Sequence, residues 1–486
     1  MSVPHPAPSS PERSRFLSEA DCHDIVQRLA RFAKGGGYTA VTIQSSWTGN
    51  VRWGRNQIST SGEVRNNMIR VYRNLNGASQ GVTVNDTSDA ALVAAARRAE
   101  RVAALHQEAP QSDLIARLPL EPTTAPPLFS EATYQLDAAH RAAAAVALAK
   151  AAAAVGMLSA GYIEVSAHSM AVLDTLGRVR YFPYTHARYS VTVRDSRAQG
   201  SGWAGVDDYQ WSRIDAAKLT AQALDKCLTS RHPVRIEPGR YMTILEPQAV
   251  CDFIGPMVYG GLGDRALERN GNESSSNPGP FFKVQDTSML GDRVVDERIT
   301  LSADPMDAEL GFPPFNAMGT DGPDSFTNPV YHPVTWIDRG VLTNLAYDRA
   351  WAIGILGQDT GLPNSGSFRM SGGEMSIEEM IATTRRGLLV TRFVDVLQLN
   401  FRSLLYRGYT RDGLWLIEQG KISHPVMNLA FTESILFALN NVEQLGVSQR
   451  TFHRDPWWSY SQNPQPVMVP ALKIKDFSFT SLVDAV

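Results

Sequence analysis

The second half of the chain is dominated by short strand-like segments, and this feature constrains the fold most strongly. From Tyr241 onward, runs rich in β-branched and aromatic residues alternate with loops rich in glycine, proline, asparagine and serine. We expect strands at Tyr241–Leu245, Arg298–Leu301, Val334–Ile337, Val341–Tyr347, Leu388–Gln398, Gly413–Glu418 and Ala471–Phe479. Helical spacing predicts helices at Ser376–Arg386 and Thr432–Leu445. Residues 233–486 are therefore predicted to form a strand-rich, barrel-like C-terminal domain.

The first half alternates helices with antiparallel strands. Ser18 stands where a helix N-cap belongs, and the apolar residues that follow, up to Phe32, recur at helical spacing. Further helices are expected at Ala90–Ala104, Leu136–Val155 and Asp215–Ser230. Strands are expected at Ala40–Ser45, Val51–Arg55, Glu63–Arg73, Gly81–Val84, Tyr162–Leu173, Arg178–Tyr184 and Ala187–Asp195. The whole chain is thus predicted to be α+β in class, with a helix and antiparallel-sheet part before the strand-rich domain.

Composition divides the chain into five parts. Residues 1–17 are rich in proline and serine and are expected to be a disordered tail. Residues 18–107 are expected to be an N-terminal α+β domain, and the proline-rich residues 108–129 a linker. Residues 130–232 combine helices with a β-meander, and residues 233–486 are the C-terminal domain.

The charge balance and the cysteines limit the compartment and the partners. The 486 residues include 46 Lys plus Arg against 49 Asp plus Glu, a formal net charge of -3, which argues against nucleic acid or a membrane surface as the main partner. The three cysteines form no CxxC pair and fit a reducing cytoplasm. The N-terminal residues lack the apolar run of a secretory signal, and no apolar run reaches the ~18 residues of a membrane span. We expect a cytoplasmic protein.

Motifs with catalytic or metal-binding spacing are scarce. There is no HExxH or HExxxH motif, and no two histidines lie four residues apart. His168 and His186 are interpreted as structural or surface residues on neighbouring strands. The paired carboxylates at 207–208 are interpreted as solvated or capping groups. His453 beside Asp455 is a weak candidate for acid–base or metal chemistry.

Two other features have both a structural and a functional interpretation. Cys251 is followed by Asp252, whose charge would raise the thiol pKa, so a buried core cysteine is favoured over a nucleophile. The adjacent Trp457 and Trp458 would place one ring on each face of a strand. A core position together with a dimer interface is favoured there over a ligand platform.

Six segments in order carry a recognisable pattern: Val64–Ala103, Asp174–Gly177, Ile299–Pro305 with Trp336–Ala352, Ser371–Val390 (SGGEMSIEEMIATTRRGLLV), Leu416–Val426 (LIEQGKISHPV) and Val469–Phe479 (VPALKIKDFSF). Together they resemble the TldD/PmbA family, whose PmbA-type members are also called TldE, and they cover about residues 40–480. The resemblance implies a dimer around an internal cavity. TldD-type members are zinc metallopeptidases that degrade unfolded peptides and trim leader peptides, so proteolysis and peptide maturation are implied. The family has also been labelled a modulator of DNA gyrase.

The chain departs from the catalytic pattern of that family at the zinc motif. TldD-type members carry an HExxxH helix at the start of the C-terminal domain and a later cysteine ligand. The matching stretch here is Cys251–Asp264, with Gly255 and Gly260 at the two histidine positions and Pro256 at the general-base glutamate. The region of the late cysteine, residues 453–466, contains none. Because a catalytic zinc needs about three protein ligands, the chain is closer to the PmbA/TldE type.

The resemblance therefore predicts a non-catalytic subunit of a TldD/TldE-type metallopeptidase, a pseudo-enzyme without a cofactor of its own. An HExxxH-bearing partner would supply the zinc in a heterodimer, and an unfolded or leader peptide would be the substrate. Tyr259, Asp264, Trp457 and Trp458 are the candidates for a substrate groove or an interface.

Two alternatives stay open from the sequence. The first is a stand-alone homodimer that binds a peptide for another enzyme. The second is a hydrolase with a relocated site, at His453 and Asp455 or at Cys251.

Overall fold

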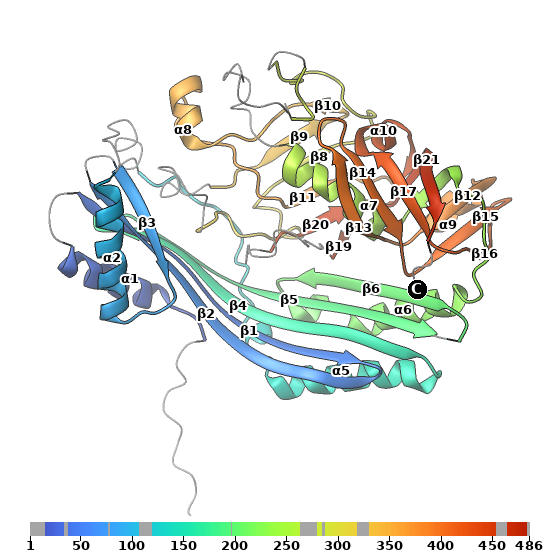
Figure 1. Cartoon of the computed structure of the whole chain (residues 1–486), viewed down its shortest axis with the longest axis horizontal. Helices are drawn as coiled ribbons and strands as arrows, with labels where there is room; N and C mark the ends of the chain where they lie inside the picture. The colour runs from blue at the N-terminus through green and yellow to red at the C-terminus, as the bar shows by residue number, and fades with distance from the viewer. Residues whose placement is uncertain are drawn as a thin grey trace, which may run out of the picture.

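The computed structural model shows an α+β protein, as the sequence predicts, with a long curved sheet in its N-terminal half (Figure 1). The C-terminal half lies over one side of this sheet, and helix α5 lies on the other. The structure describes residues 15–33, 37–75, 78–105, 119–195, 197–262, 279–283, 287–317, 330–452 and 464–483. Within these ranges no helix is long and apolar enough to cross a membrane.

The N-terminal sheet has six antiparallel strands in the order β3-β2-β1-β4-β5-β6. They are β1 Tyr38–Gly54, β2 Gln57–Leu75, β3 Ala78–Val84, β4 Leu158–Asp174, β5 Val179–Asp195 and β6 Gly200–Asp208. The prediction of two short strands within β1 is wrong, because its polar middle is paired with both β2 and β4 and the main-chain hydrogen bonds continue through it. β1 to β3 come from the segment before residue 108 and β4 to β6 from the segment after residue 129, so both segments build one sheet.

Helices cover one face of this sheet. They are α1 Glu19–Phe32, α2 Asp89–Ala103, α4 Glu131–Tyr134, α5 Ala138–Ala154 and α6 Ala216–Thr229, with a short 3₁₀ turn at Trp211–Arg213. Ser18 caps α1 through the backbone N–H of Asp21. Val41 packs against α1 and α2, and Trp47 packs against α5, because alternate residues of β1 point to the same face. The opposite face carries polar side chains such as Gln44 and also a buried hydrophobic cluster, in which Tyr72 and Met170 pack with Phe315 and Val330.

Two sheets and short helices build the C-terminal half. One sheet has nine strands, in the order β13-β14-β17-β21-β7-β12-β15-β16 with β18 paired to β21, and the other has six, in the order β10-β9-β8-β11-β20-β19. The strands are β7 Gly239–Leu245, β8 Leu301–Ala303, β9 Val334–Asp338, β10 Val341–Leu342, β11 Phe368–Met370, β12 Arg386–Val390, β13 Phe393–Asn400, β14 Leu405–Thr410, β15 Leu414–Glu418, β16 Lys421–Pro425, β17 Leu429–Ser434, β18 Val442–Leu445, β19 Gln449–Thr451, β20 Val467–Val469 and β21 Leu472–Leu482. The helices are α7 Pro247–Pro256, α8 Arg349–Trp351, α9 Ile377–Ala382 and α10 Ile435–Asn440, with π-helical turns at Met257–Gly261 and Ala352–Leu356.

Three sequence predictions for this half need correction. The helix expected at Thr432–Leu445 is short: α10 has six residues and lies between β17 and β18. Residues of β17 alternate between buried and half-buried, so the strand pairs with β14 and β21 before Ser434 caps the helix. The strand expected at Leu388–Gln398 is two strands, and the strand expected at Val341–Tyr347 ends at Leu342.

Candidate functional site

Helix α7 and the π turn that follows it form the site where the sequence places the lost zinc motif. Pro247 begins the helix, at a position where its fixed φ fits and no N–H is needed. Buried apolar residues then follow around the helix, because it is enclosed by strands from both C-terminal sheets. The ring of Phe253 lies 5.7 Å from that of Phe431 and 5.3 Å from that of Phe477, centroid to centroid. This aromatic cluster fixes the helix firmly in the core.

The helix widens at its C-terminal end. The N–H of Leu262 bonds to the carbonyl oxygen of Met257 at 3.2 Å, five residues back, so Met257–Gly261 is a π-helical turn. Such single turns often occur at functional sites, and they bring residues five apart toward the same side of the helix. Gly255 and Gly260 are five residues apart, as are the two histidines of an HExxxH motif. The backbone between these two positions is therefore wider than a regular α-helix from Met257 onward.

The side chains at these positions lack the chemistry of a zinc site. Gly255 and Gly260 carry no donor atom, and Pro256 cannot accept a proton. A Cβ added to Gly255 would lie 3.3 Å from Cε2 of Tyr259, whereas one added to Gly260 would lie 3.5 Å from Cε2 of Phe401. The residues present do not fit the zinc that the family's catalytic members bind. Across the part of the chain that the structure describes, no group of three or more His, Cys, Asp or Glu residues is arranged to hold a metal ion.

Tyr259 is half-buried and packs against a neighbouring loop. A Cβ on Gly366, whose φ is +77°, would lie 2.7 Å from Cε1 of Tyr259 and 2.6 Å from Nε2 of Gln465. Asn364 of the same loop donates a hydrogen bond from Nδ2 to the carbonyl oxygen of Val258 at 2.5 Å. The ring of Tyr259, which extends from the π turn, therefore packs directly against the loop at Gly366. Only glycine at position 366 allows so close an approach.

A polar clamp fixes the other end of the helix, and sequence analysis missed it. The side-chain amide of Gln248 bonds to both backbone groups of Phe452, accepting from its N–H at 3.0 Å and donating to its carbonyl oxygen at 2.9 Å. Nε2 of Gln248 also donates to Asp252 at 2.8 Å, and Asp252 accepts from the N–H of Phe393 at 3.0 Å. The spacing of four residues between Gln248 and Asp252 on a helix is the sequence signal that could have revealed this contact.

Several residues that the sequence singles out lie outside the described ranges. They are Asp264, Trp457, Trp458, His453 and Asp455. Their proposed roles stay predictions.

Cys251 is a core residue, as interpreted from the sequence. Its side chain is buried in α7. Burial, followed by the charge of Asp252, raises the pKa of the thiol well above its ordinary value, although a hydrogen bond with Thr451 opposes this shift. A protonated, enclosed thiol is a poor nucleophile at neutral pH.

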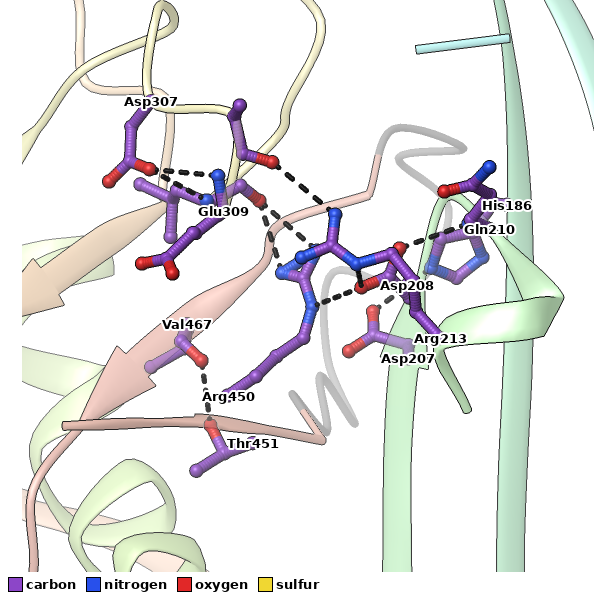
Figure 2. Close-up of polar contacts among 12 residues, drawn as sticks. His186, Asp207, Asp208, Gln210, Arg213, Asp307, Glu309, Arg450, Thr451 and Val467 are labelled. Atoms are coloured by element: carbon purple, nitrogen blue, oxygen red, sulfur yellow. Dashed lines mark hydrogen bonds and ion pairs between the residues drawn. The ribbon is translucent and has the colours of Figure 1, made fainter. Parts of the chain in front are cut away.

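A second group of polar residues joins the two halves of the molecule (Figure 2). Asp208, at the end of β6, accepts hydrogen bonds from Nε of Arg450 and from the N–H of Gln210, both at 3.0 Å. Arg213 lies 3.4 Å away, and Arg450 also donates to the carbonyl oxygen of Leu310 at 3.1 Å. Asp208 is only 4% exposed. The interpretation of residues 207–208 as solvated groups is therefore wrong, because both are buried, whereas the contact of Asp208 with the N–H of Gln210 is of the capping kind.

The 304–311 loop is fastened by its own ion pairs (Figure 2). Asp307 accepts two hydrogen bonds from Arg369 of β11, at 2.6 and 2.9 Å, and Glu309 accepts a third at 3.0 Å. Burial raises the pKa of Asp307, but Arg369 and backbone N–H groups more than offset this, and the pKa lies below its ordinary value. The loop thus stays anionic and tied to β11.

Two histidines, His168 and His186, lie on the face of the N-terminal sheet opposite its helices. His186 contacts the carboxylate of Asp207 at 2.9 Å, and His168 stacks on the Tyr184 ring at 4.6 Å between centroids. Burial, and secondarily the charge of His186, lowers the pKa of His168 to about 3, so this imidazole is neutral at physiological pH. Burial raises the pKa of Asp207, but the hydrogen bond from His186 and nearby arginines hold it below its ordinary value. These groups are paired or neutral, which is consistent with the structural role predicted for both histidines.

The arrangement defines an α+β protein whose helix α7 ends in a π turn and carries no zinc-binding side chain at Gly255, Pro256 or Gly260. The sequence profile of the PmbA/TldA metallopeptidase C-terminal domain matches residues 238–481, from β7 into β21. The chain belongs to the PmbA/TldD family.

Solved structures share the whole fold. TldE from Thermococcus kodakarensis has a TM-score of 0.76 and 14% identity, covering 95% of this chain and 100% of its own. A proposed modulator of DNA gyrase from Bacteroides thetaiotaomicron has a TM-score of 0.74, 16% identity and coverage of 96% and 100%. A proposed modulator of a DNA gyrase from Thermotoga maritima has a TM-score of 0.74 and 12% identity, covering 94% of this chain and 100% of its own. A search of curated proteins gave no match. At these identities the structural matches show the fold alone.

Proposed function

We propose that this chain is the non-catalytic subunit of a TldD/TldE-type zinc metallopeptidase complex. The observation that carries the proposal is that α7 and its π turn offer no zinc-binding side chain at Gly255, Pro256 and Gly260, the positions that the resemblance assigns to two zinc ligands and the general base. Such a helix lacks the groups for water activation. The zinc and the general base would come from an HExxxH-bearing partner subunit in a cytoplasmic heterodimer.

The role of this subunit would be to wall the chamber and to hold an unfolded or leader peptide beside the partner's zinc. A firm wall is what the contacts of α7 support: the Phe253 cluster on one side, the Gln248 clamp to Phe452 at one end and the wedged Tyr259 at the other. Peptide held by strand addition gains main-chain hydrogen bonds with little demand on its sequence. That mode suits proteolysis of varied peptides, with neither nucleic acid nor membrane as a partner.

Co-expression with the HExxxH-bearing relative from the same genome tests the proposal. We expect native mass spectrometry to show both subunits in equal number in one complex, and we expect peptide cleavage well above that of either subunit alone. Replacing the partner's motif glutamate by glutamine should abolish the cleavage. Cys251→Ala in this chain is the matched control and should leave cleavage unchanged. Cleavage by the purified chain alone, lost in Cys251→Ala, would establish the relocated hydrolase instead.

A further inference from the structure

Strand β2 has a long edge that no described strand covers. β3 pairs with β2 only over Ile69–Leu75, whereas β1 pairs with β2 along its whole length. Residues 57–67 therefore have β1 on one side and no backbone partner among the described residues on the other. In Figure 1 the β1–β2 hairpin runs beyond the end of β3 along the margin of the sheet. An unpaired edge of this kind is a template for another strand.

The free edge of β2 is exposed to solvent, and a bulge interrupts its regular strand geometry near one end. Residues 57–65 are all exposed, and Val64 has 60% of its surface exposed to solvent. The register with β1 shifts between Arg52 and Trp53, which pair with Thr60 and Ile58, so a bulge lies at residue 59. Residues 60–67 form an unbroken strand that ends where β3 begins to pair.

Two charges of opposite sign stand on this regular stretch. Glu63 is held in place by Arg141, at 2.8 Å, and by Nε1 of Trp47, at 3.2 Å. The hydrogen bond from Arg141 lowers the pKa of Glu63, although partial burial opposes it, so the carboxylate is charged at neutral pH. Arg65 lies two residues further along the same face and makes no ion pair within the described ranges.

These charges select one register for pairing with a second copy of the chain. Side chains that lie directly opposite each other in an antiparallel pair point to the same face of the sheet. When two identical strands pair about a two-fold axis, one residue must therefore lie directly opposite its own copy, with the axis between the two. An axis at residue 63 or 65 would oppose like charges. An axis at Gly62 would extend the pairing across the bulge at residue 59. An axis at Val64 places Glu63 opposite Arg65 twice and keeps residues 61–67 in regular strand.

We propose that a second copy of this chain pairs with residues 61–67 of β2 in an antiparallel, two-fold arrangement centred on Val64. The two six-stranded sheets then form one continuous sheet. The exposed Val64 side chains meet at the axis, and two Glu63–Arg65 pairs flank them. Helix α7 lies in the other half of the molecule (Figure 1), so this contact is independent of the proposed peptidase role.

Cysteine cross-linking of the full chain without any partner tests the register. Opposite residues in a sheet have Cβ atoms about 4.5–5.5 Å apart, within reach of a disulfide. Under mild oxidation, Val64→Cys should give a cross-linked dimer on a non-reducing gel. Gly62→Cys and Asn66→Cys are matched controls on the same face, each about 13 Å from its copy, and should cross-link far less. The three native cysteines are buried and do not compete.

Charge reversal tests the contact by a second readout. We expect the wild-type chain to sediment as a dimer and Arg65→Glu to weaken its association by at least about tenfold, since two favourable cross-strand pairs become repulsive. Arg402→Glu, which makes the same charge change at an exposed turn of the C-terminal half, should leave the dimer intact. A monomeric wild type, or equal cross-linking at residues 62, 64 and 66, would overturn the proposal.

Discussion

Helix α7 and the polar junction around Asp208 and Arg450, which joins the two halves of the molecule, differ in the side chains that they contain. At α7 the helix ends in a π turn at Met257–Gly261, but Gly255 and Gly260 carry no side chain that could bind zinc. At the junction the titratable side chains are abundant, but each is tied by a contact, as Asp208 is by Arg450. Neither region presents a free acid, base or metal ligand among its described residues. This contrast underlies the proposal that the chain gives shape and rigidity to a complex.

The largest effect should come from the aromatic cluster that fixes α7. Phe253→Ala removes a fully buried ring and should lower the free energy of unfolding by about 3–5 kcal/mol. Urea denaturation of the full chain measures this. Phe437→Ala, at a ring that is 43% exposed, is the matched control and should cost about 1 kcal/mol or less. Equal losses in the two variants would mean that α7 is not the rigid wall described here.

The junction should be the next most sensitive region. Arg450→Ala leaves the buried Asp208 with a weaker contact to Arg213 and should cost about 2–4 kcal/mol in unfolding free energy. Arg339→Ala removes an arginine whose side chain is 82% exposed and should cost below about 0.5 kcal/mol. Thermal or urea unfolding of both variants distinguishes them. If Arg450→Ala is as mild as Arg339→Ala, the junction does not hold the halves together.

The free energy of unfolding should also depend on pH, through the buried His168 of strand β4. The pKa of His168 is 6.5 in a model peptide and about 3 in the fold, so the unfolded chain binds an extra proton between these values. Stability is therefore fully present above about pH 6.5 and is lost as the pH falls, by about 2 kcal/mol at pH 5. His168→Gln should flatten this part of the pH profile of urea midpoints. A loss of the same size in the variant would assign it to other groups.

The smallest change in the free energy of unfolding is expected at Gly260, one of the two positions that the resemblance assigns to zinc ligands. Gly260 is exposed and helical, and a Cβ there meets only the Phe401 ring, at 3.5 Å. Gly260→Ala should therefore be neutral or raise the free energy of unfolding by up to about 1 kcal/mol. Gly366→Ala, at a φ of +77° and against Tyr259, should instead destabilise the chain. A destabilised Gly260→Ala, measured by urea unfolding, would show that the glycine is needed there for backbone shape.

Local chemistry explains which elements the sequence predicts well. Ser18 and Ser376 cap their helices through the spacing to an acidic residue, and both capping boxes are present. Tertiary pairing explains the failures: Thr432 and Glu433 fit a helical spacing but lie in β17, where β14 and β21 supply hydrogen bonds that no local pattern reveals.

The site shows the same division between local and long-range information. Gly255, Pro256 and Gly260 are assigned to the lost motif by the resemblance of the sequence alone, and whether each of them could bind zinc is a property of the residue itself. The burial of Asp208 could not be predicted, since its partner Arg450 lies 242 residues away along the chain. The clamp between Gln248 and Phe452 depends on a similarly distant contact.

Zinc content measured with activity tests the central claim most directly. The chain and its HExxxH-bearing relative would be purified separately and together, and zinc per subunit determined by native mass spectrometry alongside peptide cleavage. The account predicts no bound zinc and no cleavage for this chain alone, and one zinc per heterodimer that disappears when the partner's motif histidines are replaced. Stoichiometric zinc in this chain alone, together with peptide cleavage, would contradict it.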